Sequence, residues 1–344
     1  MKIDNILITG ATGAFGKYLL KELLTTDSHI TALVRAENDE AARQRIAQHV
    51  TDKQALSRVK VLKADLTKIN LGLSNQDYAQ LHQSTTAVLH AAASTRFDLS
   101  LADARRHNVT TLKNVLGLIH GSKKLVKFGY VSTAFVAGKQ SGLISERELD
   151  ASEGFVNTYD QTKFEAESLV RTKMHDLPVA IYRPSLIVAP DTNNHHAAVV
   201  VLNLVKNNLL PILPGQPDDL VDLISADKAA KAITNLFTNH FTSGETHHIV
   251  SGKYAPTLET IVAIAKQPNT KTIYAGYDTR TYDDMIRRLL LEQPALEPIY
   301  RKIDCFIKYL CYTKEFAVNS NYVFGKPSDT EDIIKTLRQL VNNG

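Results

Sequence analysis

Cysteine is scarce in this sequence: its 344 residues include only Cys305 and Cys311. They lie six residues apart, which matches neither a disulfide framework nor a metal-binding cysteine pair with partners, so we expect buried, reduced thiols. No uninterrupted apolar run approaches the twenty residues of a membrane-spanning helix, so no span is predicted. The first predicted strand follows almost directly on Met1, which leaves no room for a signal peptide and favours a cytoplasmic protein.

An excess of charge of one sign is also missing. The net charge is only +4 and the two signs are mixed, so the sequence gives no reason to propose a nucleic-acid partner. Neither a Ser-His-Asp hydrolase elbow nor a GK[ST] phosphate loop occurs. The histidine pairs are adjacent residues, whereas a helical metal-ligand pair needs a spacing of three or four. We therefore predict no metal and interpret the pairs as surface loop and strand histidines, His195–His196 and His247–His248.

Short β-branched runs alternate with helical patterns through the first half of the chain. This alternation is typical of a parallel sheet with crossover helices. The sequence therefore predicts an α/β fold: a Rossmann-type doubly wound parallel sheet with a smaller, mainly helical C-terminal region. The predicted strands are 4–9, 29–34, 59–63, 86–90, 126–132 and 178–182. The predicted helices are 15–26, 38–50, 76–83, 100–120 and 158–175.

The glycine stretch TGATGAFG, Thr9 to Gly16, stands between an apolar run and a helical pattern. In a dinucleotide-binding turn, one glycine makes the tight turn, one lets the backbone approach a pyrophosphate, and one lets helix and strand pack closely. The following helix presents free N–H groups to the phosphates. The alternative is a strand-to-helix turn with no ligand, but the position of the stretch between a predicted strand and a predicted helix favours cofactor binding. The residues assigned to this turn are Gly10, Thr12, Gly13, Phe15 and Gly16.

The loops after the next strands should complete the cofactor site. At the end of the second strand an acid bonds the ribose 2′-hydroxyl, whereas an arginine accepts a 2′-phosphate. The residue there is Arg35, so we predict NADP, with NAD less favoured. Asp65, before Leu66, either bonds the adenine amino group or forms a turn. A run of alanines after the fourth strand either leaves room for a flat ligand or packs closely: Ala91, Ala92 and Ala93.

Tyr159 and Lys163 form the candidate reaction centre. Residues four apart share one face of a helix, so the tyrosine oxygen and the lysine nitrogen can point into one pocket. A nearby ammonium would lower the tyrosine pKa from about 10, and the pair could then exchange a proton as hydride moves. A hydroxyl from Ser132 or Thr133, at the end of the fifth strand, could donate to a substrate carbonyl oxygen. The same Tyr-Lys spacing recurs at 322–326, but Gly325 and Pro327 argue against a helix there.

The pattern becomes less regular after residue 188. A helix at 224–237 and a strand at 247–250 are predicted to return to the sheet, and the chain ends in a helix at 329–341. We therefore assign 1–188, with 224–250, to an NADP-binding Rossmann domain. Residues 189–223 and 251–344 are assigned to a substrate-binding region.

The order and spacing of these segments resemble the extended short-chain dehydrogenase/reductases. More narrowly, they look like the thioester-reductase and fatty acyl-CoA reductase branch, with its male-sterility type NAD-binding domain. The resemblance runs over roughly residues 3–235. The segments that carry it, besides the glycine stretch, are 33–36, 64–67, 71–74, 90–93, 108–109, 130–134, 163–167 and 182–185.

The resemblance implies a Rossmann fold, usually with NADPH, and a catalytic set that falls by motif on Thr133, Tyr159 and Lys163. It also implies that Lys163 holds the nicotinamide ribose and that Pro184 and Ser185 flank the nicotinamide. The chain departs from the family at three places. Asp160-Gln161 stands where a small or aromatic residue is more usual, and His195–His196 replaces a glycine-containing turn. The 344 residues include no adenylation or carrier domain, so a carrier-bound substrate would arrive on another protein.

The leading hypothesis is an NADP(H)-dependent reductase of an acyl thioester or a carbonyl derived from it. A sugar-nucleotide epimerase or a hydroxysteroid-type dehydrogenase would use the same three residues on another substrate. A catalytically silent NADP-sensing protein is an alternative of another class, although a sensor has no physical need for the intact set. The apolar segment 285–312 is either a helical pair packed on the core, or a mobile cover over an acyl channel that could touch a membrane or carrier protein. For a cover, truncation after residue 284 should harm long-chain turnover more than folding.

Overall fold

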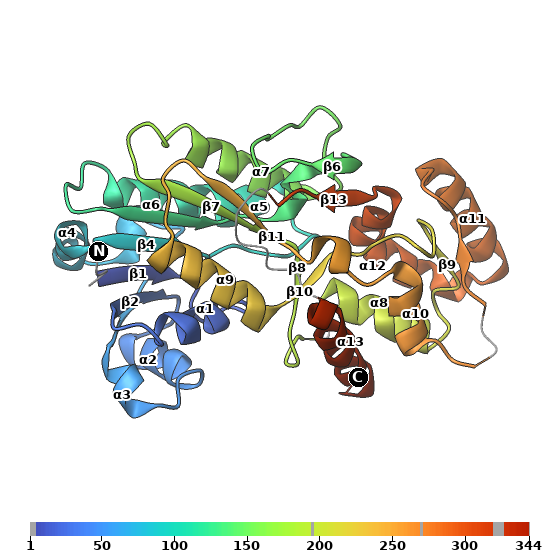
Figure 1. Ribbon diagram of the computed structural model, residues 1–344, viewed down its shortest axis with the longest axis horizontal. Helices are drawn as coiled ribbons and strands as arrows, with labels where there is room; N and C mark the ends of the chain where they lie inside the picture. Colours follow the sequence, from blue (N-terminus) through green and yellow to red (C-terminus); the bar gives the residue numbers. More distant parts are fainter. Residues whose placement is uncertain (1–4, 194–195, 269–270, 319–326, 344) are drawn as a thin grey trace.

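The computed structural model describes residues 5–193, 196–268, 271–318 and 327–343, and a parallel sheet of seven strands lies at its centre (Figure 1). The strands are ordered β3-β2-β1-β4-β5-β7-β11, and every neighbouring pair is parallel. This order confirms the predicted doubly wound, Rossmann-type sheet. The strands are β1 Asn5–Thr9, β2 His29–Val34, β3 Val59–Lys63, β4 Ala87–His90, β5 Lys127–Val131, β7 Val179–Pro184 and β11 Thr246–Ile249.

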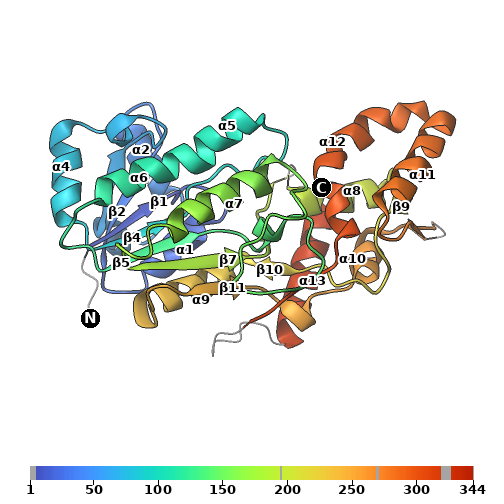
Figure 2. The same cartoon turned by 90° about the horizontal axis from the view of Figure 1, so that it is seen from above.

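Helices cover both faces of this sheet. Ile6 and Ile8 of β1 contribute to one core and Leu7 to the other, because successive side chains of a strand point to opposite faces. α1, α2 and α9 pack on the first face, and α4, α6 and α7 pack on the second (Figure 2). These helices, with the short α3 before β3, are α1 Gly16–Leu23, α2 Asp39–Ala47, α3 Lys53–Ser57, α4 Asn75–Ser84, α6 Thr111–Ile119, α7 Thr158–Arg171 and α9 Ala226–Asn239.

The predicted helix 100–120 changes its winding in the middle. α5, Leu101–Arg105, passes into a π-helical turn, Arg106–Thr110, which continues into α6. The wider turn buries Asn108, whose amide nitrogen donates to Thr162 Oγ1 at 3.0 Å and to the Ser94 carbonyl at 3.2 Å. Such π turns are common at functional sites.

The rest of the chain folds around a second apolar core beside the end of β7 (Figure 1). Residues 224–250 instead return to the sheet as α9 and β11. The buried side chains of α9 belong to the core on the face of the sheet that α1 and α2 also cover. That the second part binds substrate stays a prediction. Its elements are β8 Leu186–Val188, α8 Ala197–Lys206, β9 Ile212–Leu213, β10 Leu223–Ser225, α10 Leu258–Ala265, β12 Ile273–Tyr274, α11 Thr279–Glu292, α12 Glu297–Ile307 and α13 Pro327–Asn343.

α11 and α12 form the helical pair in the segment 285–312. Ile286, Ile303 and Ile307 are buried in the second core, whereas Leu291 is 79% exposed. The burial favours the packed pair over a detachable cover, because truncation after residue 284 would remove much of this core. This burial argues against the expectation that truncation would spare folding, which stays untested.

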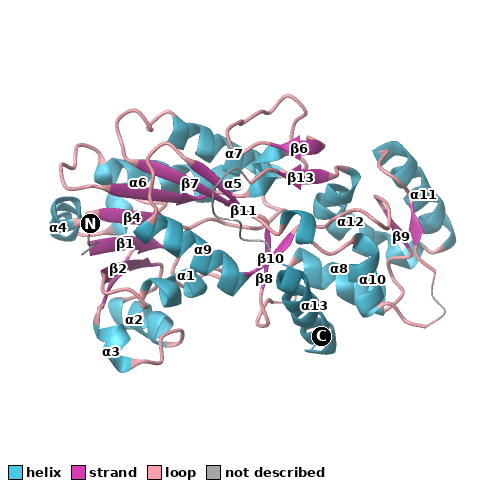
Figure 3. Ribbon diagram, viewed as in Figure 1, coloured by secondary structure: helices cyan, strands magenta, loops and turns pink. Residues whose placement is uncertain are grey.

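A short strand joins the end of the chain to the sheet domain. β13, Lys314–Phe316, pairs in parallel with β6, Gly142–Ile144, which follows β5 (Figure 3). The neighbouring turn η6, Lys308–Cys311, contains Tyr309 and a buried Cys311. Both cysteines are free, but Cys305 is only partly buried. The second Tyr-Lys copy, 322–326, lies outside the described residues.

Candidate active site

The glycine turn connects β1 to α1 at the carboxyl edge of the sheet. The backbone φ of Gly10 is +77°, a value that residues other than glycine rarely adopt. A Cβ at this position would lie 2.8 Å from the Ala92 nitrogen. A Cβ on Gly16 would lie 1.8 Å from the Gly10 carbonyl oxygen, so only glycine lets α1 start this close to β1. The backbone therefore forms a turn of the shape that a pyrophosphate site needs. Three further residues of the turn are at least partly exposed: Thr12, Gly13 and Phe15.

Arg35 is exposed directly after β2. Its carbonyl oxygen accepts a hydrogen bond from the Arg45 guanidinium of α2, so a second cation lies near the same strand end. Asp65 is partly buried, and its Oδ1 accepts hydrogen bonds from the Thr67 nitrogen at 3.0 Å and hydroxyl at 2.7 Å. Burial opposes its ionisation, but these bonds and the nearby cations lower the pKa of Asp65 overall. The turn reading thus accounts for Asp65, and contacts from Asp65 or the partly buried Leu66 to adenine stay predictions.

The alanines after β4 lie against the glycine turn. Ala91 donates its N–H to the Thr9 carbonyl at 3.3 Å, and Ala92 donates to the Thr9 hydroxyl at 3.2 Å. Both are partly buried, while Ala93 is exposed. Close packing against the glycine turn therefore explains Ala91 and Ala92.

His90 connects the glycine turn to the reaction centre. Its Nδ1 lies 2.8 Å from the Thr9 hydroxyl, and its ring stacks on Tyr130 with centroids 6.0 Å apart. Burial, with the charge of Lys163, lowers the pKa of His90 to about 3, so the ring is neutral. In the sequence, the only indication of these contacts was that His90 stands at the end of a predicted strand.

Ser132 and Thr133 follow β5 and have different partners. Ser132 donates to Glu167 Oε2 at 2.7 Å, inside a buried ion-pair network. Thr133 instead hydrogen-bonds the Tyr159 side chain, and its hydroxyl lies 3.4 Å from the Pro184 carbonyl oxygen. Of the two candidates, only Thr133 therefore lies beside Tyr159.

Tyr159 and Lys163 lie one turn apart on α7, whose first turn is capped by Asn157. Lys163 is buried, and its ammonium donates to the Tyr130 hydroxyl at 2.8 Å and to the Val131 carbonyl at 2.9 Å. The lysine therefore reaches the end of β5, the same strand end that Thr133 follows. The fold thus brings the threonine, the tyrosine and the lysine together at the carboxyl edge, where open α/β sheets bind ligands.

The tyrosine pKa differs from the expectation. Burial raises the pKa of Tyr159, and the Asp160 carboxylate adds to the rise, while the Thr133 hydrogen bond opposes it. The expected lowering by Lys163 is absent, because its amine bonds Tyr130 and Val131 instead. Burial lowers the pKa of Lys163 itself to about 7, against the opposing charge of Glu167.

A buried ion-pair network supports these residues. Glu167 and Arg183 are both almost fully buried, with Arg183 Nη2 2.7 Å from Glu167 Oε1. Arg171 reaches the same carboxylate at 2.9 Å, one helical turn along α7. Because removing one partner of a buried pair costs about 3–5 kcal/mol, the network fixes α7 against β5 and β7. In the sequence, the i, i+4 spacing of Glu167 and Arg171 could have indicated this network, but no role was assigned to the pair.

The end of β7 carries Pro184 and Ser185. The Ser185 nitrogen donates to the Ile249 carbonyl at 3.2 Å, and its side chain is buried. Because the Pro184 carbonyl meets Thr133, this strand end borders the reaction centre. A role beside the nicotinamide stays a prediction.

The histidine pairs lie apart from the reaction centre residues. His247 and His248 are in β11 and both are buried, which corrects the expectation of surface positions. His248 Nδ1 lies 2.7 Å from the Ala317 carbonyl. His196 precedes α8, and His195 lies outside the described residues. Within the described ranges, no group of three or more His, Cys, Asp or Glu side chains is placed to hold a metal ion.

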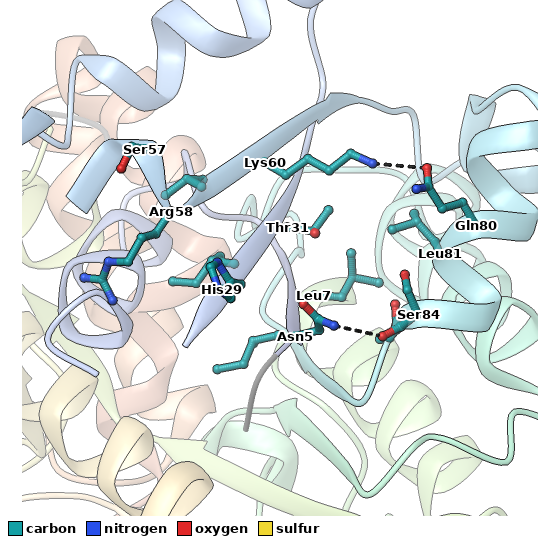
Figure 4. Close-up of a pocket in the computed structure, with 14 residues that line it drawn as sticks. Asn5, Leu7, His29, Thr31, Ser57, Arg58, Lys60, Gln80, Leu81 and Ser84 are labelled. Carbon is teal, nitrogen blue, oxygen red and sulfur yellow. Dashed lines mark hydrogen bonds between the residues drawn. The ribbon is translucent and has the colours of Figure 1, made fainter. Parts of the chain in front are cut away.

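A cavity of about 380 Å³ lies at the opposite edge of the sheet, at the amino ends of β1, β2 and β3 (Figure 4). His29, Arg58 and Lys60 line it, but the Arg58 guanidinium bonds the Leu24 and Thr26 carbonyls. This cavity is far in the fold from Tyr159, because the strands run from one edge to the other. Among the helices that the structure describes, none has the length and apolar composition to cross a bilayer.

Known proteins resemble both the sequence and the fold. The chain is 29% identical over 223 residues to fatty acyl-CoA reductase 2 of Mus musculus, a match that covers 54% of this chain and 43% of that protein. It is 26% identical over 276 residues to fatty acyl-CoA reductase wat of Drosophila melanogaster, covering 67% and 53%. The chain thus spans about half the length of the curated relatives it matches.

A solved structure has the same fold over the whole chain. The terminal R domain from the myxalamid PKS-NRPS biosynthetic pathway superposes with a TM-score of 0.82 at 24% identity, covering 100% of this chain and 92% of that one. The family model described as male sterility protein, an NAD-binding domain, matches residues 8–233. Since that match covers well over half of the 344 residues, the chain belongs to the male sterility protein family, whose model describes an NAD-binding domain.

Proposed function

We propose that this chain is an NADPH-dependent reductase of acyl thioesters, or of carbonyl compounds derived from them. The observation that carries the proposal is the meeting of Thr133, Tyr159 and Lys163 at the carboxyl edge of the sheet. Fatty acyl-CoA reductases among the relatives support the substrate class. The R domain with the same fold supports a carrier-bound acyl group as a second form of substrate. We also infer a cytoplasmic location, which the two free cysteines support.

The residues of the glycine turn fit a dinucleotide. Gly10 and Gly16 let the turn pack closely against the loop after β4 and against itself, where a Cβ would clash, and the first N–H groups of a helix that follows such a turn can bind phosphate. Arg35, exposed at the end of β2, would contact the 2′-phosphate, and Lys163 would bond the nicotinamide ribose. When bound, NADPH would supply the hydride that reduces the substrate carbonyl carbon.

The chain's own residues would bind and protonate the substrate oxygen. Thr133 and Tyr159 donate hydrogen bonds to that oxygen, which gains charge as the carbonyl is reduced. Tyr159 then gives its proton to the oxygen. A raised pKa suits this role, because the tyrosine stays protonated until the substrate oxygen becomes basic.

The test is to follow NADPH consumption with acyl-CoA, acyl-carrier and aldehyde substrates, NADPH formation with hydroxysteroids, and epimer formation with nucleotide sugars. We expect turnover with an acyl thioester and no reaction with nucleotide sugars. Reaction with a nucleotide sugar or a hydroxysteroid in place of the thioesters would overturn the proposal. Tight NADPH binding with no turnover on any substrate would instead indicate a sensor.

A further inference from the structure

The Tyr130 side chain lies between the glycine turn and the reaction centre. It belongs to β5 and is almost fully buried. Its hydroxyl accepts a hydrogen bond from the Lys163 amine at 2.8 Å, and the amine nitrogen lies 4.4 Å from the centre of the tyrosine ring. Tyr130 is therefore in direct contact with one of the three residues of the proposed reaction centre.

A second set of contacts fixes the Tyr130 ring. The His90 ring stacks on it with an angle of 16° between the planes, and His90 Nδ1 lies 2.8 Å from the Thr9 hydroxyl. Thr9 is the first residue of the glycine stretch, and its hydroxyl accepts the Ala92 N–H at 3.2 Å. The three side chains of Thr9, His90 and Tyr130 are all buried, so close packing holds them in place. A continuous series of contacts thus connects the Lys163 amine to the glycine turn.

The Lys163 amine bonds β5 through two of its N–H groups. A charged lysine side chain has three donors and no acceptor. One N–H bonds the Tyr130 hydroxyl, and a second bonds the Val131 carbonyl at 2.9 Å. Among the described residues, the amine has no third hydrogen-bond partner. Because two bonds fix the orientation of a tetrahedral group, the remaining N–H points in a defined direction, away from these two acceptors.

Two explanations of the Tyr130 hydroxyl can be distinguished. A hydroxyl that only satisfies a buried amine would stabilise the folded chain, and its loss would affect the binding of all ligands alike. A hydroxyl that orients the amine would matter only to a ligand group that contacts the amine. The position favours the second explanation, because Lys163 reaches the carboxyl edge of the sheet one helical turn from Tyr159.

We propose that Tyr130 is a positioning residue: together with the Val131 carbonyl it orients the Lys163 amine, so that the remaining N–H is available to the nicotinamide ribose. The inference rests on the proposed function for the dinucleotide and for the contact between Lys163 and that ribose. Tyr130 itself contacts neither cofactor nor substrate in this arrangement, and it acts through Lys163. A donor that is already oriented binds more tightly, because less side-chain freedom is lost on binding.

The test compares two ligands that share the adenosine 2′-phosphate. NADPH contains the nicotinamide ribose, whereas adenosine 2′,5′-bisphosphate lacks that ribose and the phosphate that carries it. In Tyr130→Phe, which keeps the ring, NADPH should bind about three- to tenfold more weakly, the worth of one hydrogen bond. The affinity for adenosine 2′,5′-bisphosphate should change by less than about twofold, because this ligand does not reach Lys163. Calorimetric titration measures both affinities. An equal loss for both ligands, or no loss for NADPH, would overturn the inference.

Tyr182→Phe is the matched control. Tyr182 is a buried tyrosine of the neighbouring strand β7, and its ring stacks on His247 at the same angle of 16°. Within the described ranges its hydroxyl has no hydrogen-bond partner. The variant thus removes a buried tyrosine hydroxyl without changing the contacts of the amine, and both affinities should stay as they are. If NADPH binding weakens as much as in Tyr130→Phe, the effect is a general response of the sheet and the inference is wrong.

A double-mutant cycle decides whether Tyr130 acts through Lys163. Lys163→Met has a side chain of similar shape without the amine. Adding Tyr130→Phe to it should change NADPH affinity by less than about twofold, because no amine remains to be oriented. A further loss as large as that in the unmodified background would contradict the inference. If Tyr130→Phe alone does not fold, this comparison decides, because the double variant leaves neither a buried amine nor a buried hydroxyl unpaired.

The inference and the proposed function can fail separately. If the chain binds NADPH but reduces no thioester, the binding comparison still tests Tyr130, and only the proposed function fails. If the chain prefers NADH, the same comparison is made with NADH and ADP, which lacks the nicotinamide ribose. Thioester reduction together with an equal loss of affinity for both ligands in Tyr130→Phe would leave the proposed function standing and remove only the role of Tyr130.

Discussion

The sheet domain and the region around the second core differ in where their polar side chains lie and in what they bond. In the sheet domain the side chains at the strand ends are buried and bonded, as with Lys163 on Tyr130 and Ser132 on Glu167. In the second region, the ion pairs of α11 and α12 lie at the surface, as with Arg287 and Asp284 or Arg301 and Glu297. The comparison indicates that the sheet domain holds the residues of the proposed reaction centre in fixed positions. The second region reaches that chemistry through Tyr309 and its contacts with Asp160 and Asn157.

The largest expected effect comes from Tyr159→Phe, which breaks the chemistry of the sheet domain alone. We expect a loss of turnover of about 10²–10⁴-fold, because the proton donor disappears while the ring keeps its place. NADPH affinity and Tm should stay close to those of the unmodified protein. Steady-state kinetics and a cofactor titration provide the measurement. Tyr322→Phe is the control and should keep full turnover, and an equal loss in both variants would show that Tyr159 has been misassigned.

Ile303→Ala addresses the second core instead. Ile303 is 1% exposed on α12, so the cavity that its truncation leaves should destabilise the protein by about 2–5 kcal/mol. Turnover should fall further than NADPH affinity, because the glycine turn belongs to the other core. Chemical denaturation and a cofactor titration measure the two effects. Parallel loss of NADPH binding and turnover in the folded variant would show that the regions are not separable.

Arg35→Ala tests the cofactor preference of the sheet domain. The loss of a charge-assisted phosphate contact should weaken NADPH binding by about 1.5–3 kcal/mol, or roughly 10- to 150-fold. NADH affinity is the internal control and should change little, since NADH has no 2′-phosphate. Fluorescence titration of both cofactors measures the effect. Equal affinity for NADPH and NADH in the unmodified protein would contradict the NADP prediction.

Leu291→Ser should have the smallest effect. Leu291 projects from α11 with 79% of its surface exposed, so stability should change by less than about 0.5 kcal/mol. The variant is a matched control for Ile303→Ala on the neighbouring helix. If Leu291→Ser nonetheless lowers turnover on long acyl chains, or binding to lipid vesicles, then α11 contacts substrate or membrane as well as the second core.

The sequence predicted the sheet domain well because its signals are local. The strand of residues 29–34 and that of residues 59–63 were placed to the residue, since β-branched runs between turn residues specify strands without reference to distant contacts. The glycine stretch was predicted to combine a tight turn with close packing of helix and strand, and the φ of Gly10 and the short distances at Gly16 agree with those steric roles. Tyr159 and Lys163 followed from helical spacing.

What the sequence could not supply were contacts between residues far apart in the chain. The spacing of Tyr159 and Lys163 predicted a lowered tyrosine pKa, but Tyr130, from another element, takes the lysine's hydrogen bond. Ser132 and Thr133 were equivalent in the residue pattern, and Glu167 distinguishes them. These outcomes depend on which side chains the packed sheet brings within about 3 Å of each other.

The sequence by itself thus determined the fold class, the glycine turn and the helix that carries the tyrosine and lysine, because each rests on periodicity or steric demand within a few residues. Only the tertiary structure decided the burial of Asp160, its bond to Tyr309 and the packing of α11 and α12 into a second core. Burial and hydrogen bonding between distant segments follow from how the two cores meet, and no local pattern of residues encodes that meeting.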